Sequence, residues 1–423
     1  MLRLLLAFVW IFPLAQQPPA VKPAPPVEPN RSQHVPFPQV KDWKSVKITL
    51  QRNACYAECP WYNVEVHGDG SVFYAGKSYV AVRGHHRDRV PQNNVLELVR
   101  MFEQADYYSL PAQYSPCLLD SETQVTSIEI DGQRKQLFSC TDGENPAPPA
   151  IFKLEEAIDG LSDSVRWTRG NAATVPALQA EHWDFKSAGA AATLARVAQY
   201  GNADAVRALV SRGAPINGKN DRGNTPLVQA ALQGNVAMLR PLLGAGAAAN
   251  RPDLAHAVVS AAYGGKVEAL RFLLRYGGSL NSRDADGRTV LMAAATSGSP
   301  AVVKEVLKSH PNVNARASCG RCEHAGRTAL MEVAAHDFWT TSPEDVLEVT
   351  ELLLHSGAQV NVRDRQGNTA LILCTQHTTK LTLPLIQAGA DVNARNNVGD
   401  TALSQADDDD LKRLLMQHGA VHK

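Results

Sequence analysis

Apolar and polar positions recur in one order along residues 189–423. Each copy opens on a short apolar helix rich in Ala, breaks at a Gly, and continues as a second helix with one apolar face. One such helix pair is too small to bury its own apolar surface, so neighbouring copies must stack into a continuous core. The pattern predicts an all-α solenoid of about seven repeats. The copies open 31 to 41 residues apart, at Ala192, Thr225, His256, Thr289, Thr328, Thr369 and Thr401.

Turn residues keep the same register in these copies. A Gly such as Gly246 ends a second helix, an Asn such as Asn250 follows, and polar residues with Gly precede the next Thr. These last residues predict hairpins, which we call fingers. On these landmarks, with the Thr-x-Leu openings, residues 189–423 resemble the ankyrin repeat family. The resemblance implies L-shaped helix pairs, fingers along one edge and a concave surface that binds a protein partner.

Two insertions interrupt the register of the repeats. Residues 317–324 lengthen one finger, and residues 337–345 separate the two helices of the next repeat. Insertions in repeat arrays form loops, often on the binding face, although a neutral loop expansion fits equally well. Phe338 and Trp339 favour a contact, because exposed aromatic side chains are enriched at binding sites.

Residues 44–169 have a different hydrophobic pattern, which predicts several strands and two helices. Apolar alternation predicts strands over residues 46–50, 62–66, 72–74, 126–130 and 134–138, and amphipathic helices over residues 91–105 and 151–161. We therefore expect a small α+β domain with an antiparallel sheet. Its segment 83–89, which includes His85 and His86, is expected to be a solvated loop beside an edge strand rather than a metal or anion site.

This segment resembles an uncharacterised bacterial family of small exported domains of unknown function. The resemblance supplies a domain boundary and no activity, and residues 170–188 are expected to link the domain to the repeats. The residues that carry it are Cys55-Tyr56-x-x-Cys59-Pro60-x-Tyr62, Gly68-Asp69-Gly70-x-Val72-x-Tyr74 and Phe102-x-x-Ala105-Asp106-Tyr107-Tyr108.

The first forty residues indicate export. Arg3 precedes a short apolar run that ends near Ala15, which is typical of a signal peptide over residues 1–15. The run is too short to span a bilayer as a stable helix, so no membrane span is expected after cleavage; an uncleaved anchor is the alternative. Residues 16–40 are Pro-rich and predict an extended tether. We expect a bacterial protein that is periplasmic or secreted.

Cysteine usage agrees with an oxidising compartment. Six cysteines fall in close or plausible pairs, which makes disulfides the favoured interpretation and leaves the connectivity open; Cys374 is expected to be a buried free thiol. The pair in the lengthened finger, with His324 nearby, has a metal half-site and redox exchange as alternatives. The disulfide candidates are Cys55, Cys59, Cys117, Cys140, Cys319 and Cys322.

The charge pattern points to a protein partner. The formal net charge is zero, so no global field favours nucleic acid or an anionic membrane. The fingers nevertheless lean basic, and Arg side chains suit bidentate pairing with acidic or mixed protein surfaces; ordinary solvation of hairpin tips is the alternative. With the two inserted aromatic residues, the expected partner-binding residues are Arg222, Arg283, Arg288, Arg316, Arg321, Phe338, Trp339, Arg363, Arg365 and Arg395.

The sequence predicts a non-enzymatic, monomeric binding protein without a cofactor. No phosphate-binding Gly loop, nucleophile elbow or H-E-x-x-H motif occurs. The alternative is an N-terminal domain that is an enzyme or binds a small ligand and is delivered by the repeats. A cleft with convergent polar groups near Cys55, Tyr62, His67 and Asp69 would favour it. A third hypothesis is self-protection, in which the repeats cover a toxic or hydrolytic partner.

Overall fold

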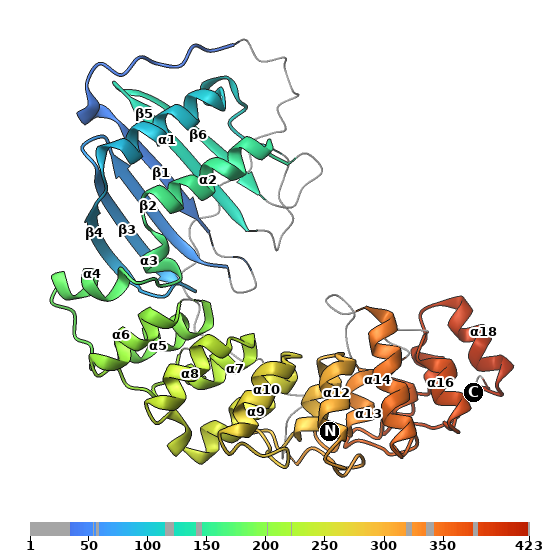
Figure 1. Ribbon diagram of the computed structural model, residues 1–423. Helices are drawn as coiled ribbons and strands as arrows, with labels where there is room; N and C mark the ends of the chain where they lie inside the picture. The colour runs from blue at the N-terminus through green and yellow to red at the C-terminus, as the bar shows by residue number, and fades with distance from the viewer. Residues whose placement is uncertain are drawn as a thin grey trace, which may run out of the picture.

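The computed structural model describes residues 34–421, except residues 54, 56–58, 115–121, 141–145, 201, 221, 319–323, 336–341 and 375–379. It confirms the expected architecture of an α+β domain with an antiparallel sheet followed by a helical solenoid (Figure 1). The sheet and its helices form one end of the molecule. The helix pairs run away from it as a single curved row that ends at the C-terminus.

The N-terminal domain is built on one antiparallel sheet with the strand order β4-β3-β2-β1-β5-β6. Consecutive strands pair as hairpins, except that β5 joins the free side of β1. Asp131 and Gly132, both in the left-handed region, make the tight turn between β5 and β6. The strands are β1 (Lys47–Arg52), β2 (Trp61–His67), β3 (Ser71–Ser78), β4 (Gly84–Arg89), β5 (Thr123–Ile130) and β6 (Gln133–Cys140).

One face of the sheet is covered by helices and the other carries polar side chains. The helices α1 (Gln92–Gln104) and α2 (Pro149–Leu161) lie across the covered face (Figure 1). They confirm the two amphipathic helices that the sequence predicts. On the opposite face Glu65 accepts from Lys47 at 2.7 Å and contacts His67 at 2.6 Å. The alternation of each strand thus separates an apolar core from a polar surface. The buried residues include Ile48, Leu50, Val64, Val66, Ile128, Leu98, Phe102, Leu154 and Ile158.

The basic segment that we expected to be a loop is the edge strand β4 itself. It pairs with β3 from Gly84 to Arg89. His86 does not face solvent, since its side chain turns into the protein and stacks on Trp167 with the ring centroids 4.4 Å apart. The expectation of a solvated loop was therefore wrong, although its charged residues fit an edge strand, where charge discourages pairing with other chains.

The solenoid contains seven consecutive helix pairs within the described residues (Figure 1). Thr side chains begin several first helices as caps: Thr289 Oγ1 accepts from the Met292 amide at 3.2 Å. The pairs are α5 (Ala188–Tyr200) with α6 (Ala203–Ser211), α7 (Pro226–Gln233) with α8 (Val236–Gly244), α9 (Arg251–Tyr263) with α10 (Val267–Arg275), α11 (Val290–Thr296) with α12 (Pro300–Leu307), α13 (Ala329–Ala334) with α14 (Pro343–His355), α15 (Ala370–Cys374) with α16 (Thr382–Gln387), and α17 (Ala402–Gln405) with α18 (Asp409–Gln417).

Small residues let the first helices of neighbouring repeats approach closely. Ala230 and Ala231 of α7 are fully buried, and α7 packs on both α5 and α9. Gly264, after α9, lies so close to α7 that an added Cβ would be 2.2 Å from the Leu232 carbonyl oxygen. The stack therefore depends on small side chains as much as on apolar ones.

In the C-terminal part of the stack, the Asn that follows a second helix ties its repeat to the next one. Asn361 Nδ2 donates to the Gly389 carbonyl at 2.9 Å, and its Oδ1 accepts from the Asp391 amide at 2.8 Å. Asn314 and Asn393 make the same pair of bonds one repeat before and one after. This geometry gives the recurring Asn of the sequence a physical role.

Replacing Asn361 by Ala should lower the free energy of unfolding of the repeats by about 1–2 kcal/mol, because both bonds to the next repeat are lost. Urea unfolding followed by circular dichroism measures this change. Gln359→Ala is the control, since Gln359 is an exposed neighbour that bonds the preceding repeat only through its backbone amide, which donates to Asn314. Equal unfolding midpoints for the two variants would contradict a linking role for Asn361.

The segment predicted as a linker is partly helical and packed. The short helix α3 (Val165–Thr168) precedes it, and α4 (Thr174–Ala180) lies within it and contacts α6. Gly170 takes a positive φ of 86° and turns the chain between the two helices. Residues 170–188 thus continue the repeat stack toward the sheet.

Several contacts join the sheet to α3 and α4. The amides of Ala81 and Val82 each donate at 2.8 Å, to the carbonyls of Thr168 and Trp167. His86 Nδ1 lies 2.6 Å from Glu181 Oε2 at the end of α4. These bonds dock the two halves of the chain on each other.

Candidate functional site

Four of the predicted finger arginines form a ladder along the fingers. Arg363 Nε donates to the carbonyl of Gly367 in its own finger at 3.2 Å, and its Nη2 donates to the Arg395 carbonyl in the next finger. Arg316 bonds Gly326 and the Arg363 carbonyl in the same way. Arg283 extends the ladder toward the N-terminus through Gly287 and the Arg316 carbonyl. The guanidinium groups of Arg283, Arg316 and Arg363 therefore bridge neighbouring repeats, and Arg395 ends the ladder by accepting the last of these bonds at its carbonyl.

The ladder holds these guanidinium groups in place and leaves them exposed. Arg283, Arg316, Arg363 and Arg395 are all exposed. A guanidinium has five N–H donors, so the carbonyl bonds leave other donors directed to solvent. Because their side chains are already ordered, less rotamer entropy is lost when they bind an anion.

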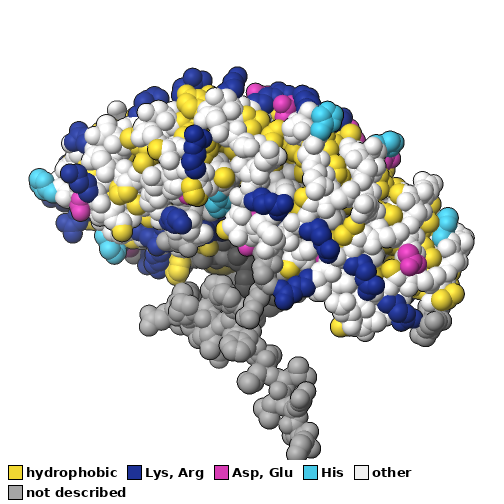
Figure 2. Space-filling view, turned by 90° about the horizontal axis from the view of Figure 1, so that it is seen from below, with side chains coloured by type: hydrophobic (Ala, Val, Ile, Leu, Met, Phe, Trp, Pro, Cys, Tyr) yellow, Lys and Arg dark blue, Asp and Glu magenta, His cyan; other side chains and the backbone are white. Residues whose placement is uncertain are grey.

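The acidic residues between these arginines are turned inward. The side chain of Asp284 is 4 % exposed and that of Asp364 is fully buried. Asp284 Oδ1 accepts from the amides of Asp286 and Arg288, and Asp364 Oδ1 accepts from the Asn368 amide, so both close their fingers. The finger edge is consequently more positive than its sequence suggests. Figure 2, which views the molecule from the finger side, shows Lys and Arg side chains in a row along the repeats.

The remaining predicted site residues lie in other settings. Arg288 is paired with Asp284 at 2.8 Å and lies over the Tyr263 ring. Arg365 lines a shallow depression between the last two fingers. Arg222 reaches the N-terminal domain instead, where its guanidinium lies 5.7 Å from the ring centroid of Tyr79. Arg321, Phe338 and Trp339 lie outside the described residues.

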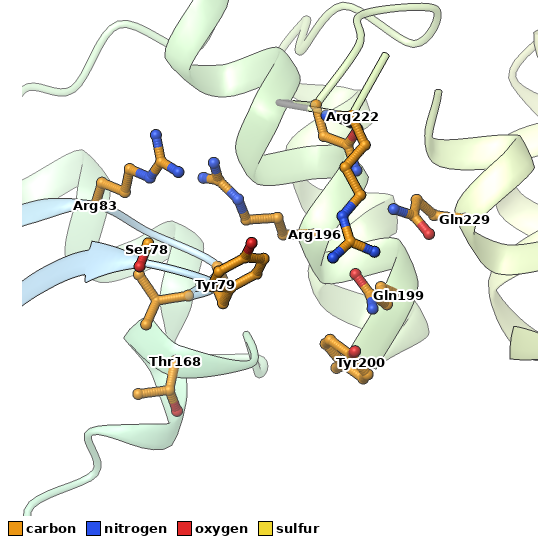
Figure 3. Close-up of a pocket in the computed structure, with 12 residues that line it drawn as sticks. Ser78, Tyr79, Arg83, Thr168, Arg196, Gln199, Tyr200, Arg222 and Gln229 are labelled. Atoms are coloured by element: carbon orange, nitrogen blue, oxygen red, sulfur yellow. Dashed lines mark hydrogen bonds between the residues drawn. The ribbon is translucent and has the colours of Figure 1, made fainter. Parts of the chain in front are cut away.

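A cavity of about 250 Å³ lies where the sheet domain meets the first repeats (Figure 3). The segment between β3 and β4 and the end of α3 line one side. The helices α5 and α7 and the first finger line the other. Sequence reasoning missed this cavity. The residues that line it are Ser78, Tyr79, Val80, Ala81, Arg83, Thr168, Arg196, Gln199, Tyr200, Asn220, Arg222 and Gln229.

Three arginines and two tyrosines give the cavity its chemistry. In Figure 3, Arg83 and Arg196 point toward each other above Tyr79, and Arg222 points toward Gln199. Burial raises the pKa of Tyr200, so this phenol stays neutral at physiological pH. The described residues that line the cavity include no Asp or Glu.

Two residues that line the cavity are held in arrangements that cost free energy. Tyr79 has a φ of 53°, a strained conformation that costs about 1–3 kcal/mol in a residue with a side chain. Gln229 is 2 % exposed, and its Oε1 has no hydrogen-bond partner among the described residues. The sequence signal for both Gln229 and Arg196 was available: they are polar residues within first helices that are otherwise apolar.

The polar groups that would favour an N-terminal catalytic cleft do not converge. Tyr62 faces the covered side of the sheet, whereas His67 lies on the open side at the other end of β2. The Tyr62 hydroxyl donates to Asp159 at 2.8 Å, and Arg52 bonds both side chains. Burial raises the pKa of Tyr62, and the network holds α2 against the sheet.

The cysteines partly follow the expectation. Cys55 and Cys59 form a disulfide. Cys140 is also disulfide-bonded, and the residue to which it is bonded lies outside the described part of the chain, as do Cys117, Cys319 and Cys322. Cys374 is free and buried, as predicted. His324, two residues after Cys322 in the sequence, contacts the buried carboxylate of Glu332 at 2.9 Å.

Among the helices that the structure describes, none has the length and apolar character needed to cross a membrane.

Comparisons with known proteins divide the chain where the fold does. Residues 46–162 match a domain of unknown function (DUF6438). Residues 164–253 and 255–317 match ankyrin repeats in sets of three copies, and residues 325–365 match a single ankyrin repeat. The repeat match begins at residue 164, so it includes the segment predicted as a linker.

Two curated relatives are ankyrin repeat proteins by name. The chain is 32 % identical over 173 residues to the ankyrin repeat and KH domain-containing protein mask-1 of Caenorhabditis elegans, which is 40 % of this chain and 6 % of that protein. It is 28 % identical over 181 residues to the ankyrin repeat protein YahD of Escherichia coli (strain K12), which is 42 % of this chain and 86 % of YahD. The alignments thus span a small part of the nematode protein and most of the bacterial one.

Proposed function

Because this chain carries ankyrin repeats behind a DUF6438 domain, we propose that it is a non-enzymatic scaffold that binds a protein partner through its fingers and concave face. The observation that carries the proposal is the ladder of Arg283, Arg316, Arg363 and Arg395. It presents an ordered row of positive charge along one edge. An acidic segment of a partner, extended along the fingers, complements this row.

The other predicted residues fit into the same surface. Arg288 and Arg365 belong to the same edge. Arg321 belongs to the lengthened finger in sequence, and Phe338 and Trp339 belong to the insertion between two helices of one repeat. The N-terminal domain acts as a second recognition or anchoring module, and the protein works as a monomer. Arg222 contributes to the domain junction rather than to the middle of the partner surface.

We further propose that the protein is exported to the periplasm or beyond the cell. The disulfide between Cys55 and Cys59 and the second disulfide at Cys140 support this, since disulfides are rare in reducing compartments. The apolar run after Arg3 provides an export signal, and the Pro-rich segment provides a tether. The expectation of an unpacked tether as far as residue 40 was wrong at its end, because Phe37 packs on Tyr108 with the ring centroids 5.4 Å apart and the Val35 amide donates to Ser109 Oγ at 2.8 Å.

Thiol titration tests the compartment. Burial raises the pKa of the Cys374 thiol to about 12, so the native protein should not react with a thiol reagent. Denatured, unreduced protein should show one reactive thiol per chain. Five or more reactive thiols among the seven cysteines would contradict export into an oxidising compartment.

The binding proposal is tested by cross-linked capture from the envelope fraction with the full chain as bait. A saturable protein partner, released by salt, is expected because exposed charge pairs are screened at high ionic strength. No captured protein, together with a substrate turned over by the full chain, would replace the scaffold proposal with an enzymatic one.

A further inference from the structure

We propose that the open face of the sheet binds an acidic glycan chain, so that the N-terminal domain anchors the protein to a polysaccharide. This inference rests on the anchoring role proposed for that domain and names its ligand class. The binding surface, which we call the sheet patch, lies on β2, β3 and β4 and consists of Trp61, Asn63, Phe73, Ala75, Lys77 and Arg87.

The register of the strands brings the sheet patch together on one face. Phe73 pairs with Arg87 across β3 and β4, and Ala75 pairs with Asn63 across β3 and β2. The remaining two members lie two residues further along β2 and β3. Because side chains alternate between the two faces of a sheet, all six lie on the face opposite to α1 and α2.

Two cations of the sheet patch are held by aromatic rings and not by carboxylates. Lys77 Nζ lies 4.2 Å from the ring centroid of Trp61, and the Arg87 guanidinium carbon lies 5.5 Å from that of Phe73. Both cations are exposed, and neither forms an ion pair with a residue that the structure describes. A ring orders a cation without neutralising it, so both charges can bind an anion with little further loss of rotamer entropy.

The carboxylate beside the sheet patch does not repel an anion strongly. Glu65 lies directly across from Phe73 in the sheet. One of its oxygens accepts from Lys47 at 2.7 Å, and the other contacts His67 at 2.6 Å. Since its charge is offset within the sheet, a carboxylate on the ligand meets the two ring-held cations instead.

The uncharged members of the sheet patch suit sugar rings. Phe73 is 37 % exposed and offers apolar surface to the C–H groups of a sugar. The side-chain amide of Asn63 both donates and accepts hydrogen bonds, as a sugar hydroxyl does. Ala75 lies between Phe73 and Lys77 on β3 and is small, so a ligand can approach the sheet closely between them.

Two other polymers fit this face less well. An extended peptide binds a sheet by pairing with a free edge, but β2 and β3 are interior strands whose backbones are paired on both sides. Nucleic-acid-binding proteins concentrate positive charge, whereas the formal net charge of this chain is zero. A glycan requires only the side chains that the face presents.

Calorimetric titration of the full chain with four hexamers tests the ligand class. Hexagalacturonate is an acidic glycan, its methyl ester is the same chain without charge, and hexaglutamate has similar charge without sugar rings. We expect hexagalacturonate to bind with a Kd of about 1 mM or tighter, and the ester and hexaglutamate to bind at least about tenfold more weakly. A thymidine hexanucleotide that binds as tightly as hexagalacturonate would assign the sheet patch to nucleic acid and overturn the proposal.

Three variants connect binding to the sheet patch. Lys77→Gln with Arg87→Gln should weaken hexagalacturonate binding at least about tenfold, since two charge-assisted contacts are lost. The matched control, Arg100→Gln with Lys153→Gln, removes the same charge from exposed positions on α1 and α2 and should leave the affinity within about twofold. Phe73→Thr retains both cations and a residue suited to a strand, and should weaken hexagalacturonate binding about fivefold.

Three results would overturn the proposal: no binding of hexagalacturonate at millimolar concentration, equal affinity in the Lys77/Arg87 variant and its control, or equal affinity for hexagalacturonate and hexaglutamate. Converting the four ladder arginines to Gln should leave hexagalacturonate binding unchanged, and a loss there would move the glycan to the fingers. Partner capture is measured separately. Glycan binding lost while capture persists refutes this site alone, and glycan binding without a captured partner refutes the scaffold proposal alone.

Discussion

Replacing Trp167 by Ala is expected to lower the free energy of unfolding by about 3–5 kcal/mol, the largest stability effect that we predict. The side chain is 1 % exposed and stacks on the His86 ring at 4.4 Å. It also lies 6.4 Å from the ring centroid of Tyr74 in the sheet core. Its removal leaves a large cavity between the sheet and the first repeats, which cannot collapse because both sides are anchored elsewhere.

Urea unfolding monitored by circular dichroism measures this effect, and Trp183→Ala is the matched control. Trp183 lies in the same connecting region but is only partly buried, against Phe185, so its loss should cost clearly less. Because Trp167 joins the two halves, its loss should also increase cleavage of the junction by added protease. A loss below about 0.5 kcal/mol, within the range of ordinary surface changes, would show that the domains are not docked through this residue.

Converting Arg283, Arg316, Arg363 and Arg395 together to Gln is expected to weaken partner binding at least about 100-fold, since several charge-assisted contacts are lost at once. Gln is chosen because its amide retains a donor for the finger carbonyls. A charge reversal would instead place a carboxylate against those carbonyls and disturb the stack. The affinity of the captured partner for wild type and variant, measured in the same buffer, gives the fold-change.

The control for this variant removes the same charge from other exposed positions. Arg207, Arg212, Arg275 and Arg413 are exposed and lie in or directly after second helices, away from the ladder. Their conversion to Gln should leave the affinity within about twofold, because distant exposed charges are screened. If both variants lose affinity equally, the effect is one of net charge and the finger row is not the site.

The repeats could be predicted from sequence because each copy repeats its own local signals. A Thr cap, small Ala residues, a Gly and an Asn recur in one register, and each has a local physical reason. The alternation of apolar and polar residues in β1, β2 and β5 likewise predicted an antiparallel sheet. The edge strand β4 was missed because its sequence, Gly-His-His-Arg-Asp-Arg, has the polar composition of a loop, and only pairing with β3 makes it a strand.

The contacts between distant segments were not predictable in the same way. The ladder bonds of Arg316 and Arg363 run to backbone carbonyls 47 and 32 residues further along the chain. Carbonyl acceptors carry no sequence signature. The cavity brings Tyr79 and Gln229 together through the docking of α3 on the sheet, in which Trp167 is buried and the amides of Ala81 and Val82 bond α3. The sequence shows where the arginines lie along the chain, but it does not show which of them bridge neighbouring fingers and which line the cavity.

Hydrogen exchange of the full chain with and without the captured partner tests most directly where the partner binds. The scaffold proposal predicts slower exchange on binding in the fingers, over residues 281–288, 312–318, 361–368 and 393–400, with the open face of the sheet unchanged. Protection confined to the sheet domain, with no change in the fingers, would contradict the account and assign recognition to the N-terminal half.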